Sequence, residues 1–568
     1  MMVKVRGLGE HPSLATGVKG RGVDFVVPEG PLFGLLERAA LVHPERVCVD
    51  FLGRTTSYGE MWRQVEALAA WLLRHGFGSG QRVGICLPNC PQAVVAYYGI
   101  LRAGGVVVNL SPLQTAEELA AQVADSGTKM VICPNLNKIL PKVYPLLLGK
   151  KLKRLMVVNF AEALPWPQSW LFRVFKFKEI SPVPAHEGLV WMEEVLAGRS
   201  KPREVKINPA KDLALLQFTG GTTGVPKAAM LTHRNLMANT EQVRIWLGET
   251  APEGERFLTI LPLFHVFAMT ACMNLGIAVG ATLVLVPAFQ LSQLLGIIRR
   301  TKPTIFPAVP SLFGAIANHF AAHPAQVAAS GMGGIRWCIS GGAPLPADIK
   351  ARFEKLSGCV IVEGYGLTEA SPVVSCTPPM RQVAGSVGQP LPGTAIEIRD
   401  LKKPAKILGA GKTGEIVAKG PQVMQGYWGK PKETAKVLQK GWLRTGDVGH
   451  LDVQGFLHLT NRLKEIILVS GYNVYPRAIE EVVYRHPKVA EVTVIGVPDA
   501  DKGERPKIFV AAKAGEVVSE AEILEFVKDK LNPLQRPVAV EVRASLPKTP
   551  MGKLDRKVLV AEERARRG

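Results

Sequence analysis

Apolar residues follow two alternating spacings along the first part of the chain. In residues 57–76, SYGEMWRQVEALAAWLLRHG, they recur at the three- and four-residue intervals of an amphipathic helix. Residues 82–89 and 106–110 are short apolar runs typical of buried strands, and residues 92–105 between them again have helical spacing. This strand–helix–strand order predicts parallel sheets joined by crossover helices.

The pattern divides the chain into a large and a small part. Alternation of the same kind returns in residues 211–400, and near residue 463 the composition becomes more charged. Beyond that point, strand-like and helix-like segments are 492–497, 507–513 and 520–531. We expect an α/β domain of mixed subdomains with parallel sheets over residues 1–463. A small, mobile α+β domain is expected over residues 464–568.

Length, charge and cysteine usage narrow the class of protein. The chain has 568 residues, too many for one hydrophobic core. Its net charge is +21, but the basic residues are spread out and no nucleic-acid-reading motif accompanies them, so we expect no nucleic-acid partner. Such a field suits phosphorylated substrates or an anionic membrane surface. The eight scattered cysteines, without a CxxC pair, and the absence of an apolar signal segment at the start favour a cytoplasmic protein.

Two segments raise the question of membrane contact. Residues 257–298 contain no Asp, Glu, Lys or Arg, and their 42 residues are long enough to span a bilayer. They include two prolines, a histidine and several amides, so we expect a buried part of the core instead. Residues 164–180, LPWPQSWLFRVFKFKEI, interleave aromatic and basic side chains. This segment either lies peripherally on the inner face of the membrane or packs its aromatics on its own domain, and both readings stay open.

One stretch has the composition of a phosphate-binding loop. Residues 218–233 read FTGGTTGVPKAAMLTH, with glycines, threonines and a lysine close together. Glycine lets consecutive backbone N–H groups approach an anion, and the hydroxyls and lysine add donors and charge. The spacing is not that of a Walker A loop, because Val225 and Pro226 separate the last glycine from Lys227.

Three further motifs carry polar groups suited to nucleotide chemistry. In VEGYGLTEASP (362–372), Tyr365 can stack on a base, Thr368 can reach a phosphate and Glu369 can hold Mg²⁺. In GWLRTGDVGHLD (441–452), Asp447 is expected in a glycine-flanked turn as an acceptor for ribose hydroxyls. The third motif, LPKTPMGKLDRKVL (546–559), offers Lys553. Each motif is weak evidence by itself.

Taken in order, these motifs closely resemble those of the adenylate-forming superfamily, which includes acyl-CoA synthetases, luciferases and peptide-synthetase adenylation domains. The resemblance covers nearly the whole chain. Its motifs are TGGTTGVPK (219–227), LPLFHVF (261–267), SGGAP (340–344), YGLTE (365–369), GWLRTGD (441–447), NRLKEIILVSGYNVYP (461–476) and PKTPMGK (547–553).

The resemblance implies that the loop grips the β- and γ-phosphates of ATP while a carboxylate attacks the α-phosphorus. Residues 341–343 would line the adenine pocket with Tyr365 stacked on the ring, and Arg462 would assist Asp447 at the ribose. The implied ATP-binding residues are Thr219, Gly220, Gly221, Thr222, Thr223, Gly224, Lys227, Gly341, Gly342, Ala343, Tyr365, Gly366, Asp447 and Arg462. The implied catalytic residues are Lys553, Thr368, Glu369, which would also bind Mg²⁺, and His265, which would orient the acyl group.

The resemblance also implies a second step, in which the thiol of CoA replaces AMP after the C-terminal domain rotates. Lys464 matches the hinge of that rotation, and Gly471 matches the glycine beside which pantetheine passes. Three departures from the family pattern stand out. Gly220 replaces a common serine, Ala228 a common glycine, and Glu465 the aspartate that often follows the hinge.

Among superfamily members, the phosphate loop, LPLFHVF and the aromatic segment 164–180 most resemble bacterial long-chain fatty-acid–CoA ligases. The expected partners are a fatty acid, ATP and CoA, and a homodimer stays open. Residues 257–298 and 304–319 are candidates for lining an acyl tunnel, although Phe267, Ala268 and Met269 stand where some relatives have a gating tryptophan. A medium-chain or aryl-acid CoA ligase and a non-catalytic, membrane-associated lipid-binding protein remain alternatives. A ligase serving a carrier protein is disfavoured, because no carrier-like domain is recognised.

Overall fold

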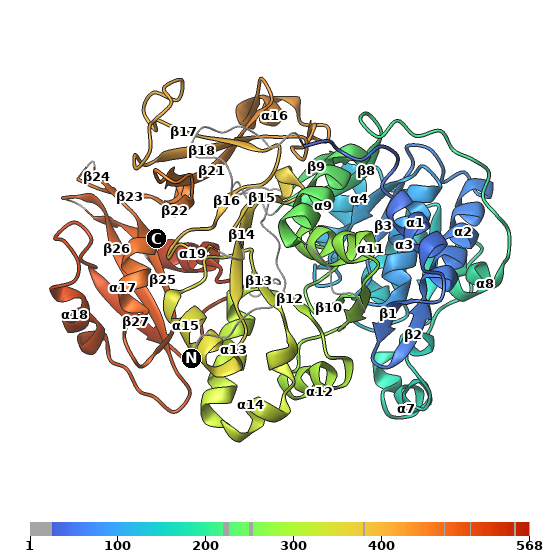
Figure 1. Cartoon of the computed structure of the whole chain (residues 1–568), viewed down its shortest axis with the longest axis horizontal. Helices are drawn as coiled ribbons and strands as arrows, with labels where there is room; N and C mark the ends of the chain where they lie inside the picture. Colours follow the sequence, from blue (N-terminus) through green and yellow to red (C-terminus); the bar gives the residue numbers. More distant parts are fainter. Residues whose placement is uncertain are drawn as a thin grey trace.

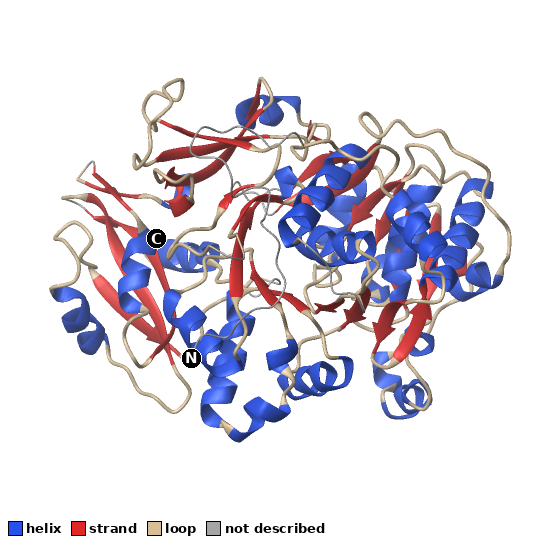
Figure 2. Cartoon of the chain, in the orientation of Figure 1, coloured by secondary structure: helices blue, strands red, loops and turns tan. Residues whose placement is uncertain are grey.

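The computed structural model describes residues 25–219, 226–248, 254–378, 381–470, 472–499, 501–549 and 553–566. Within these residues the strands form four sheets, two large and two small. The large sheets and most helices make up the body of the molecule, and the last hundred residues form a separate lobe at its side (Figure 1). Helices and strands are mixed throughout the body (Figure 2). The predicted α/β class is therefore confirmed.

The first large sheet has eight strands and carries the predicted phosphate loop. It is parallel from β8 to β7, and β9 turns back antiparallel beside β8. In spatial order its strands are β19 (Gly426–Tyr427), β9 (Lys227–Thr232), β8 (Leu213–Thr219), β4 (Val106–Asn109), β3 (Arg82–Ile85), β5 (Met130–Pro134), β6 (Arg154–Val158) and β7 (Leu189–Trp191).

The second large sheet has nine strands and is parallel in its centre, from β14 to β1. Antiparallel strands close both of its edges. In spatial order the strands are β16 (Gln389–Pro390), β15 (Val373–Cys376), β14 (Ile361–Gly366), β13 (Trp337–Ser340), β12 (Ile305–Ala308), β10 (Arg256–Thr259), β11 (Thr282–Leu285), β1 (Val47–Phe51) and β2 (Arg54–Ser57).

One continuous apolar core joins the two large sheets through several helices. These are α1 (Gly34–Val42), α2 (Tyr58–Arg74), α3 (Pro91–Arg102), α9 (His233–Leu247), α10 (Val266–Ala268), the π-helix η3 (Met269–Asn274) and α11 (Leu275–Ala278). α2 and α3 pack closely because Gly99 has no side chain: a Cβ there would lie 2.7 Å from Leu68 Cδ2. A second core, on the other face of the eight-stranded sheet, is covered by α4 (Ala116–Ser126) and α5 (Leu140–Leu148).

Further helices belong to the body, and some pack on its sheets, as Phe313 of α13 does on Phe306 of β12 with ring centroids 5.6 Å apart. They are α6 (Phe160–Ala163), α7 (Gln168–Phe175), η2 (Phe177–Glu179), α8 (Met192–Ala197), α12 (Leu291–Thr301), α13 (Pro310–Ala322), α14 (Ala325–Ala329), η4 (Met332–Gly334) and α15 (Ala347–Ser357). Phe313 of α13 and Phe353 of α15 pack edge to face, with ring centroids 4.9 Å apart.

The helices and strands expected from the pattern are present, with shifted ends. α2 begins after Ser57, whose Oγ accepts a hydrogen bond from the Glu60 N–H, so the cap sets its start. β3 ends at Ile85, shortly before Pro88, which has no N–H to donate to a ladder. The charge-free residues 257–298 form buried strands and short helices, as expected. Among the described residues, no helix is both long and apolar enough to cross a membrane.

A small antiparallel sheet connects the body to the C-terminal lobe. Its strands are β17 (Ala395–Arg399), β18 (Gly414–Lys419), β21 (Trp442–Leu451), β20 (Leu438–Gln439) and β22 (Leu457–Arg462), and α16 (Pro431–Val437) precedes β20.

The C-terminal lobe is a small α+β unit, as predicted from its sequence. Its strands are β23 (Ile467–Val469), β24 (Tyr472–Val474), β25 (Val489–Asp499), β26 (Gly503–Ala512) and β27 (Ala539–Arg543). Its helices are η6 (Leu463–Glu465), α17 (Pro476–Val483), α18 (Glu520–Lys528) and α19 (Arg556–Ala565). Two apolar clusters pack in this lobe, a larger one that includes α17 and α18 and a smaller one that includes Leu559 of α19. The boundary between residues 463 and 464 stays a prediction.

Candidate active site

A hairpin of the first large sheet holds the ends of the predicted phosphate loop. Thr219 closes β8 and pairs with Lys227 at the start of β9, so the strands bring the two residues together across the ladder. The loop itself lies outside the residues that the structure describes. This applies to Gly220, Gly221, Thr222, Thr223 and Gly224.

The glycines of two other motifs follow parallel strands of the second sheet. Residues 341–343 come directly after β13, and Gly366 ends the adjacent β14. Ligands of α/β proteins commonly bind at the carboxyl ends of such strands. A Cβ at Gly341 would lie 2.9 Å from Phe267 Cζ, and a Cβ at Gly366 would lie 1.9 Å from the Pro372 carbonyl oxygen. Gly366 therefore requires glycine, because the backbone of Pro372 cannot move aside, whereas a side chain at Gly341 would have to displace the Phe267 ring.

Tyr365, Asp447 and Arg462 meet beside the end of β14. The Tyr365 hydroxyl donates to Asp447 Oδ2 at 2.8 Å, and Arg462 Nε lies 3.2 Å from Asp447 Oδ1. Burial raises the pKa of Asp447, while Arg462 and the Tyr365 hydrogen bond act in the opposite direction. A carboxylate oxygen accepts more than one hydrogen bond, so Asp447 retains capacity for a ribose hydroxyl.

The environment of Asp447 differs from the expectation in one respect. The expected glycine-flanked turn is part of β21, in which Asp447 pairs with Arg462 of β22. Gly446 has a φ of +72°, yet the ladder continues past it with a register shift after Val448. The ladder therefore fixes the Asp447–Arg462 pair, which a turn would not have done.

Lys553 reaches this region from the C-terminal lobe. A Cβ at Gly342 would lie 3.2 Å from Lys553 Cε and 3.5 Å from Nζ, so the lysine occupies the space that the glycine leaves. Its loop is held by Thr549, whose N–H donates to the Lys553 carbonyl at 2.7 Å. Burial, followed by the charge of Arg462, lowers the pKa of Lys553 to about 8.

His265 lies close enough to Lys553 to be affected by its charge. Burial and then Lys553 lower the pKa of His265 to about 3, so the ring is neutral at neutral pH. Its Nδ1 accepts a hydrogen bond from the Phe267 N–H at 3.3 Å, which leaves the ring proton on Nε2. Neutral His265 can therefore donate a hydrogen bond from Nε2 without adding a second positive charge.

Glu369 and Thr368 form a short 3₁₀ helix, η5 (Thr368–Ala370), after β14. Glu369 Oε1 accepts a hydrogen bond from the Tyr427 hydroxyl at 2.7 Å, and this contact orients the carboxylate. A magnesium ion prefers one or two carboxylates together with substrate phosphates. Glu369 fits that demand as a single protein ligand. Among the described residues no cluster of three or more metal-binding side chains is present.

A further ion pair involves Lys227, the lysine of the phosphate loop. Its Nζ lies 2.6 Å from Glu433 Oε2 on α16 and 5.4 Å from the Tyr427 ring centroid. Lys227 and then Lys436 lower the pKa of Glu433 to about 2, so the carboxylate is charged. Tyr427 and Glu433 were not predicted from the sequence. They lie in QGYWGKPKET (425–434), where Pro431 could have predicted the start of a helix but nothing local indicates a contact with Lys227.

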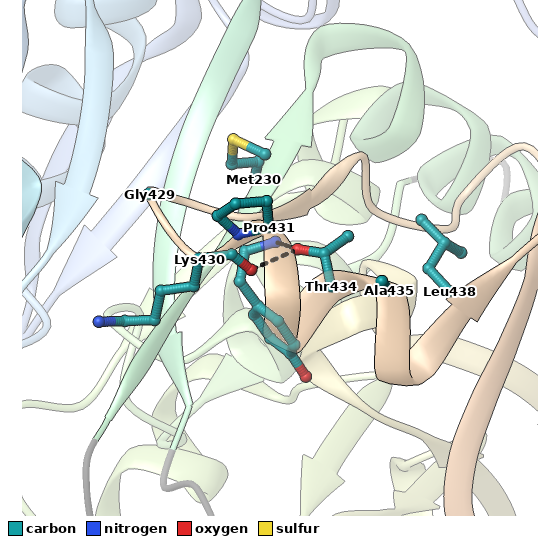
Figure 3. A pocket seen from close by; sticks show the side chains of 8 residues that line it. Met230, Gly429, Lys430, Pro431, Thr434, Ala435 and Leu438 are labelled. Atoms are coloured by element: carbon teal, nitrogen blue, oxygen red, sulfur yellow. Dashed lines mark hydrogen bonds between the residues drawn. The ribbon is translucent and has the colours of Figure 1, made fainter.

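An open hollow of about 510 Å³ borders these residues (Figure 3). Its lining residues are Met230, Tyr427, Gly429, Lys430, Pro431, Thr434, Ala435 and Leu438. The Thr434 hydroxyl is used within the wall, accepting from the Tyr427 N–H and donating to the Lys430 carbonyl. The Lys430 ammonium is 3.4 Å from Asp125. The wall therefore presents mainly apolar surface, and the tyrosine connects the hollow to Glu369.

The region expected to line an acyl tunnel is closely packed. A cavity of about 10 Å³, the size of one water molecule, lies among residues that include Leu263, Phe264 and Met273. Phe267 and Met269 lie between the lining residues Phe264 and Met273 in the sequence and are also buried. Met269 is the first residue of the π-helix η3. Such π-helical turns are frequent at functional sites. If this region receives an acyl chain, these side chains must move, because this cavity is far smaller than such a chain.

The predicted hinge lies where the small sheet ends. Lys464 is in η6, directly after β22, and Gly471 lies outside the described residues. Glu465 is ion-paired with Arg556 of α19 at 2.6 Å. Arg477 of α17 donates to the Leu459 carbonyl of β22 at 2.9 Å. The Arg477–Leu459 hydrogen bond thus joins the C-terminal lobe to the body across residue 464, while the Glu465–Arg556 pair lies within the lobe.

Comparison with known proteins identifies the family. The model of the AMP-binding enzyme family matches residues 36–428, and that of its C-terminal domain matches residues 478–553. A long-chain-fatty-acid–CoA ligase of Bacillus subtilis (strain 168) is 37% identical over 544 residues, covering 95% of this chain and 96% of that protein. One from Escherichia coli O157:H7 is 35% identical over 543 residues, covering 94% and 95%.

A solved structure shares the fold over a similar length. ATP-bound MatB from Rhodopseudomonas palustris superimposes with a TM-score of 0.80 at 27% identity, covering 93% of this chain and 98% of that one. The family model spans more than half of the chain, and the two curated relatives align along nearly all of it. The chain therefore belongs to the AMP-binding enzyme family, within the adenylate-forming superfamily.

Proposed function

We propose that the chain is a long-chain-fatty-acid–CoA ligase. In the first step a fatty-acid carboxylate attacks the α-phosphorus of ATP, forming acyl-AMP and releasing pyrophosphate. In the second step the thiol of CoA attacks the acyl carbon, forming the thioester and releasing AMP. Similarity to ligases of this name over about 95% of the chain supports the substrate class. The relative with ATP bound supports the nucleotide.

The position of Lys553 is the observation that carries the proposal. This lysine belongs to the C-terminal lobe and lies beside Gly342 of the body. Its positive charge lowers the pKa of both His265 and Asp447. A cation at this junction is suited to neutralise charge shared by the carboxylate and the α-phosphate as the adenylate forms.

In the proposed first step, the remaining residues bind and orient the nucleotide and the acid. Tyr365 stacks on adenine, Asp447 accepts from the ribose, and Arg462 holds Asp447 in place. Thr368 contacts the α-phosphate, and neutral His265 donates to the acyl carboxylate. A bound Mg²⁺ would neutralise phosphate charge, and Glu369, oriented by Tyr427, is the side chain that fits it.

In the proposed second step, Lys553 must leave the pocket so that the pantetheine arm can enter. Rotation of the C-terminal lobe about Lys464 removes it, and Gly471 is proposed to line the path of the thiol. Motions of this kind gate many enzymes that carry out two reactions at one site.

Adenylation with pyrophosphate exchange tests the proposal without CoA. Exchange is measured with Mg²⁺ across saturated acids from acetate to stearate, for the wild type and for Lys553→Ala. We expect a maximum at long chains and a loss of at least 100-fold in the variant, equivalent to about 3 kcal/mol. Lys548→Ala is the matched control, because that lysine lies on the same loop but pairs with Glu491.

Three results separate the alternatives. Exchange that peaks with medium-chain or aromatic acids retains the mechanism and replaces the substrate. Full exchange in Lys553→Ala contradicts the role of the lysine. No exchange with any acid contradicts the enzymatic proposal and favours a lipid-binding protein.

A further inference from the structure

The segment between β6 and β7 exposes an unusual group of large apolar side chains. It consists of α7, η2 and the residues that lead into them. Four aromatic side chains have exposed fractions of 57–85%, namely Trp166, Trp170, Phe175 and Phe177. Leu171 and Val174 are also exposed. None of the residues of α7 is fully buried.

The exposed apolar side chains of α7 lie on one face of the helix, with Trp166 and Phe177 just before and just after it in the chain. Trp170 and Val174 are four residues apart on α7, as are Leu171 and Phe175, so the two pairs lie side by side one turn apart. On the opposite side of the helix, Phe172 packs against Phe160 with ring centroids 5.9 Å apart. The aromatics thus do not fold back onto their own domain, apart from Phe172.

The segment is held to the body of the protein by contacts of Phe172 and of the residues that follow η2. Phe160, which receives Phe172, also packs edge to face on Phe51 of β1 at 6.2 Å. At the end of η2 and just after it, the backbone is hydrogen-bonded to the body. The Asn137 N–H donates to the Glu179 carbonyl at 2.8 Å, and Leu136 forms a β-bridge with Ile180. The exposed face is therefore held outward by contacts on both sides of it.

The exposed apolar area is large for a free surface. An aromatic side chain carries about 150–250 Å² of surface, so the four aromatics alone expose on the order of 500 Å². Monomeric proteins seldom leave a contiguous apolar patch of this size uncovered unless it contacts a partner. α7 projects from the end of the molecule opposite the C-terminal lobe (Figure 1), so the patch is remote from the candidate active site.

The positive charges beside these exposed aromatic side chains indicate the chemistry of a partner. Residues 164–180 contain three cations, Arg173, Lys176 and Lys178, and one carboxylate, Glu179. Arg173 is 3.3 Å from Glu162, and the structure gives Lys176 and Lys178 no carboxylate partner among the described residues. Both lysines are exposed next to Phe175 and Phe177. An apolar face rimmed by cations matches a membrane interface with anionic headgroups.

We propose that α7 and η2 dock the protein on anionic phospholipid bilayers. With eight residues, α7 is about 12 Å long and lies in the plane of the interface, too short to span it. Tryptophan and phenylalanine enter the headgroup boundary while the lysines contact lipid phosphates. A second copy of the chain is a less suitable partner than a membrane. A symmetric contact would bring Lys176 and Lys178 of both copies together, and their like charges would repel. The proposal is independent of the enzymatic function.

Vesicle co-sedimentation tests the proposal directly. The full chain is mixed with vesicles of phosphatidylcholine alone or with 30% phosphatidylglycerol. We expect Trp170→Ser/Phe175→Ser/Phe177→Ser to lose at least tenfold in affinity for the anionic vesicles. Phe172 is kept, because it packs inward. Lys176→Glu/Lys178→Glu is expected to lose about fivefold or more per cation on the anionic vesicles, with little change on neutral ones.

The matched control removes exposed apolar surface elsewhere. Val453 and Val517 are 72% and 82% exposed on other parts of the chain, and Val453→Ser/Val517→Ser is expected to bind like the wild type. Equal binding of the wild type and the aromatic triple variant overturns the proposal. So does an equal loss of binding in the valine control.

A site-specific probe gives a second readout. All eight native cysteines are buried, so a cysteine introduced at Phe175→Cys can be labelled selectively with an environment-sensitive fluorophore. We expect a blue shift when anionic vesicles are added, and none for the same label at Val453→Cys. A blue shift that follows protein concentration in lipid-free buffer would mean that a second copy covers the patch. That result would overturn the membrane proposal.

Discussion

The charge of Lys553 sets a pH limit on the proposed adenylation. Burial and Arg462 lower its pKa to about 8, so the ammonium is present below pH 8 and is lost as the pH rises through that value. The apparent second-order constant kcat/KM for ATP reports the free enzyme, and we expect it to fall tenfold per pH unit well above pH 8. Pyrophosphate exchange between pH 6 and pH 10 measures it. His265, with a pKa of about 3, contributes no change in this range.

Lys553→Arg separates the charge from the other properties of the side chain. A guanidinium stays protonated throughout this range, so the variant is expected to be slower than the wild type but to lack the decline above pH 8. The same decline in Lys553→Arg would assign the limit to another group.

The ion pair between Lys227 and Glu433 predicts competition with ATP. Glu433 holds the Lys227 ammonium at 2.6 Å, and its low pKa keeps it charged at all working pH values. If Lys227 binds phosphate, it must exchange this carboxylate for the nucleotide. We therefore expect Glu433→Gln to lower the KM for ATP about two- to fivefold with kcat little changed, a range typical of partly exposed ion pairs.

Lys436→Gln is the control for the Glu433 prediction, because it removes the other partner of Glu433 and leaves Lys227 in place. A KM for ATP that rises in Glu433→Gln would show the opposite role, in which Glu433 holds Lys227 in its productive position. Steady-state kinetics at two salt concentrations distinguish a charge effect from a change of shape.

Single residues differ in how far the sequence predicts their surroundings. The resemblance to adenylate-forming enzymes already implied that Asp447 and Arg462 belong to one site. In the structure Arg462 Nε lies 3.2 Å from Asp447 Oδ1. Glu433 belongs to none of the motifs recognised in the sequence, because a single carboxylate on a surface helix is common and indicates no particular chemistry. Its significance comes only from the contact with Lys227, which is 206 residues away along the chain.

At the level of elements, the turn from β14 into η5 depends on Gly366. A Cβ there would lie 1.9 Å from the Pro372 carbonyl oxygen, and this atom belongs to the backbone, so it cannot move aside cheaply. We expect Gly366→Ala to lower the free energy of unfolding by about 3 kcal/mol or more. Because η5 carries Thr368 and Glu369, pyrophosphate exchange should fall as well. Urea unfolding and exchange assays measure both effects.

Gly364, on the same strand, provides the matched comparison. The atoms nearest to a Cβ at that position lie 3.9–4.0 Å away, which is ordinary contact. Gly364→Ala should therefore change the free energy of unfolding by less than about 1 kcal/mol. Equal destabilisation by the two substitutions would argue against the steric explanation.

The α7 segment shows where periodicity stops being informative. Its interleaved aromatic and basic residues marked the segment as unusual, but they did not by themselves predict the helix α7. The spacing left open whether the aromatics face the protein or the solvent. The answer depends on Phe160, which packs on Phe51 and receives one aromatic of the segment, Phe172. The other aromatics stay exposed. Such a contact between distant residues has no signature in the local pattern.

For the whole molecule, the α/β class and the small C-terminal lobe could be predicted because both rest on local alternation of strands and helices. The order of strands in the sheets could not. β1 pairs with β11, more than 200 residues later, and β19 joins the first sheet from beyond the second. Long-range pairings of this kind depend on the packing of helices such as α2 and α3 against both sheets. The volume of the region proposed to bind the acyl chain could not be predicted either, because it depends on the rotamers of buried side chains such as Phe267.

The two-step proposal predicts that the lobes must move about residue 464. In the structure, Lys553 already lies beside Gly342, which is the arrangement that the first step requires. Proline fixes φ near −65°, so Lys464→Pro should restrict rotation at the hinge. We expect this variant to keep pyrophosphate exchange within about threefold of the wild type and to lose at least tenfold in thioester formation from purified acyl-AMP and CoA. Lys464→Ala, which keeps both dihedral angles free, should retain both activities. Equal loss of the two half-reactions in Lys464→Pro would mean that residue 464 stabilises the site and is not a hinge. Full thioester formation would place the hinge elsewhere in the chain.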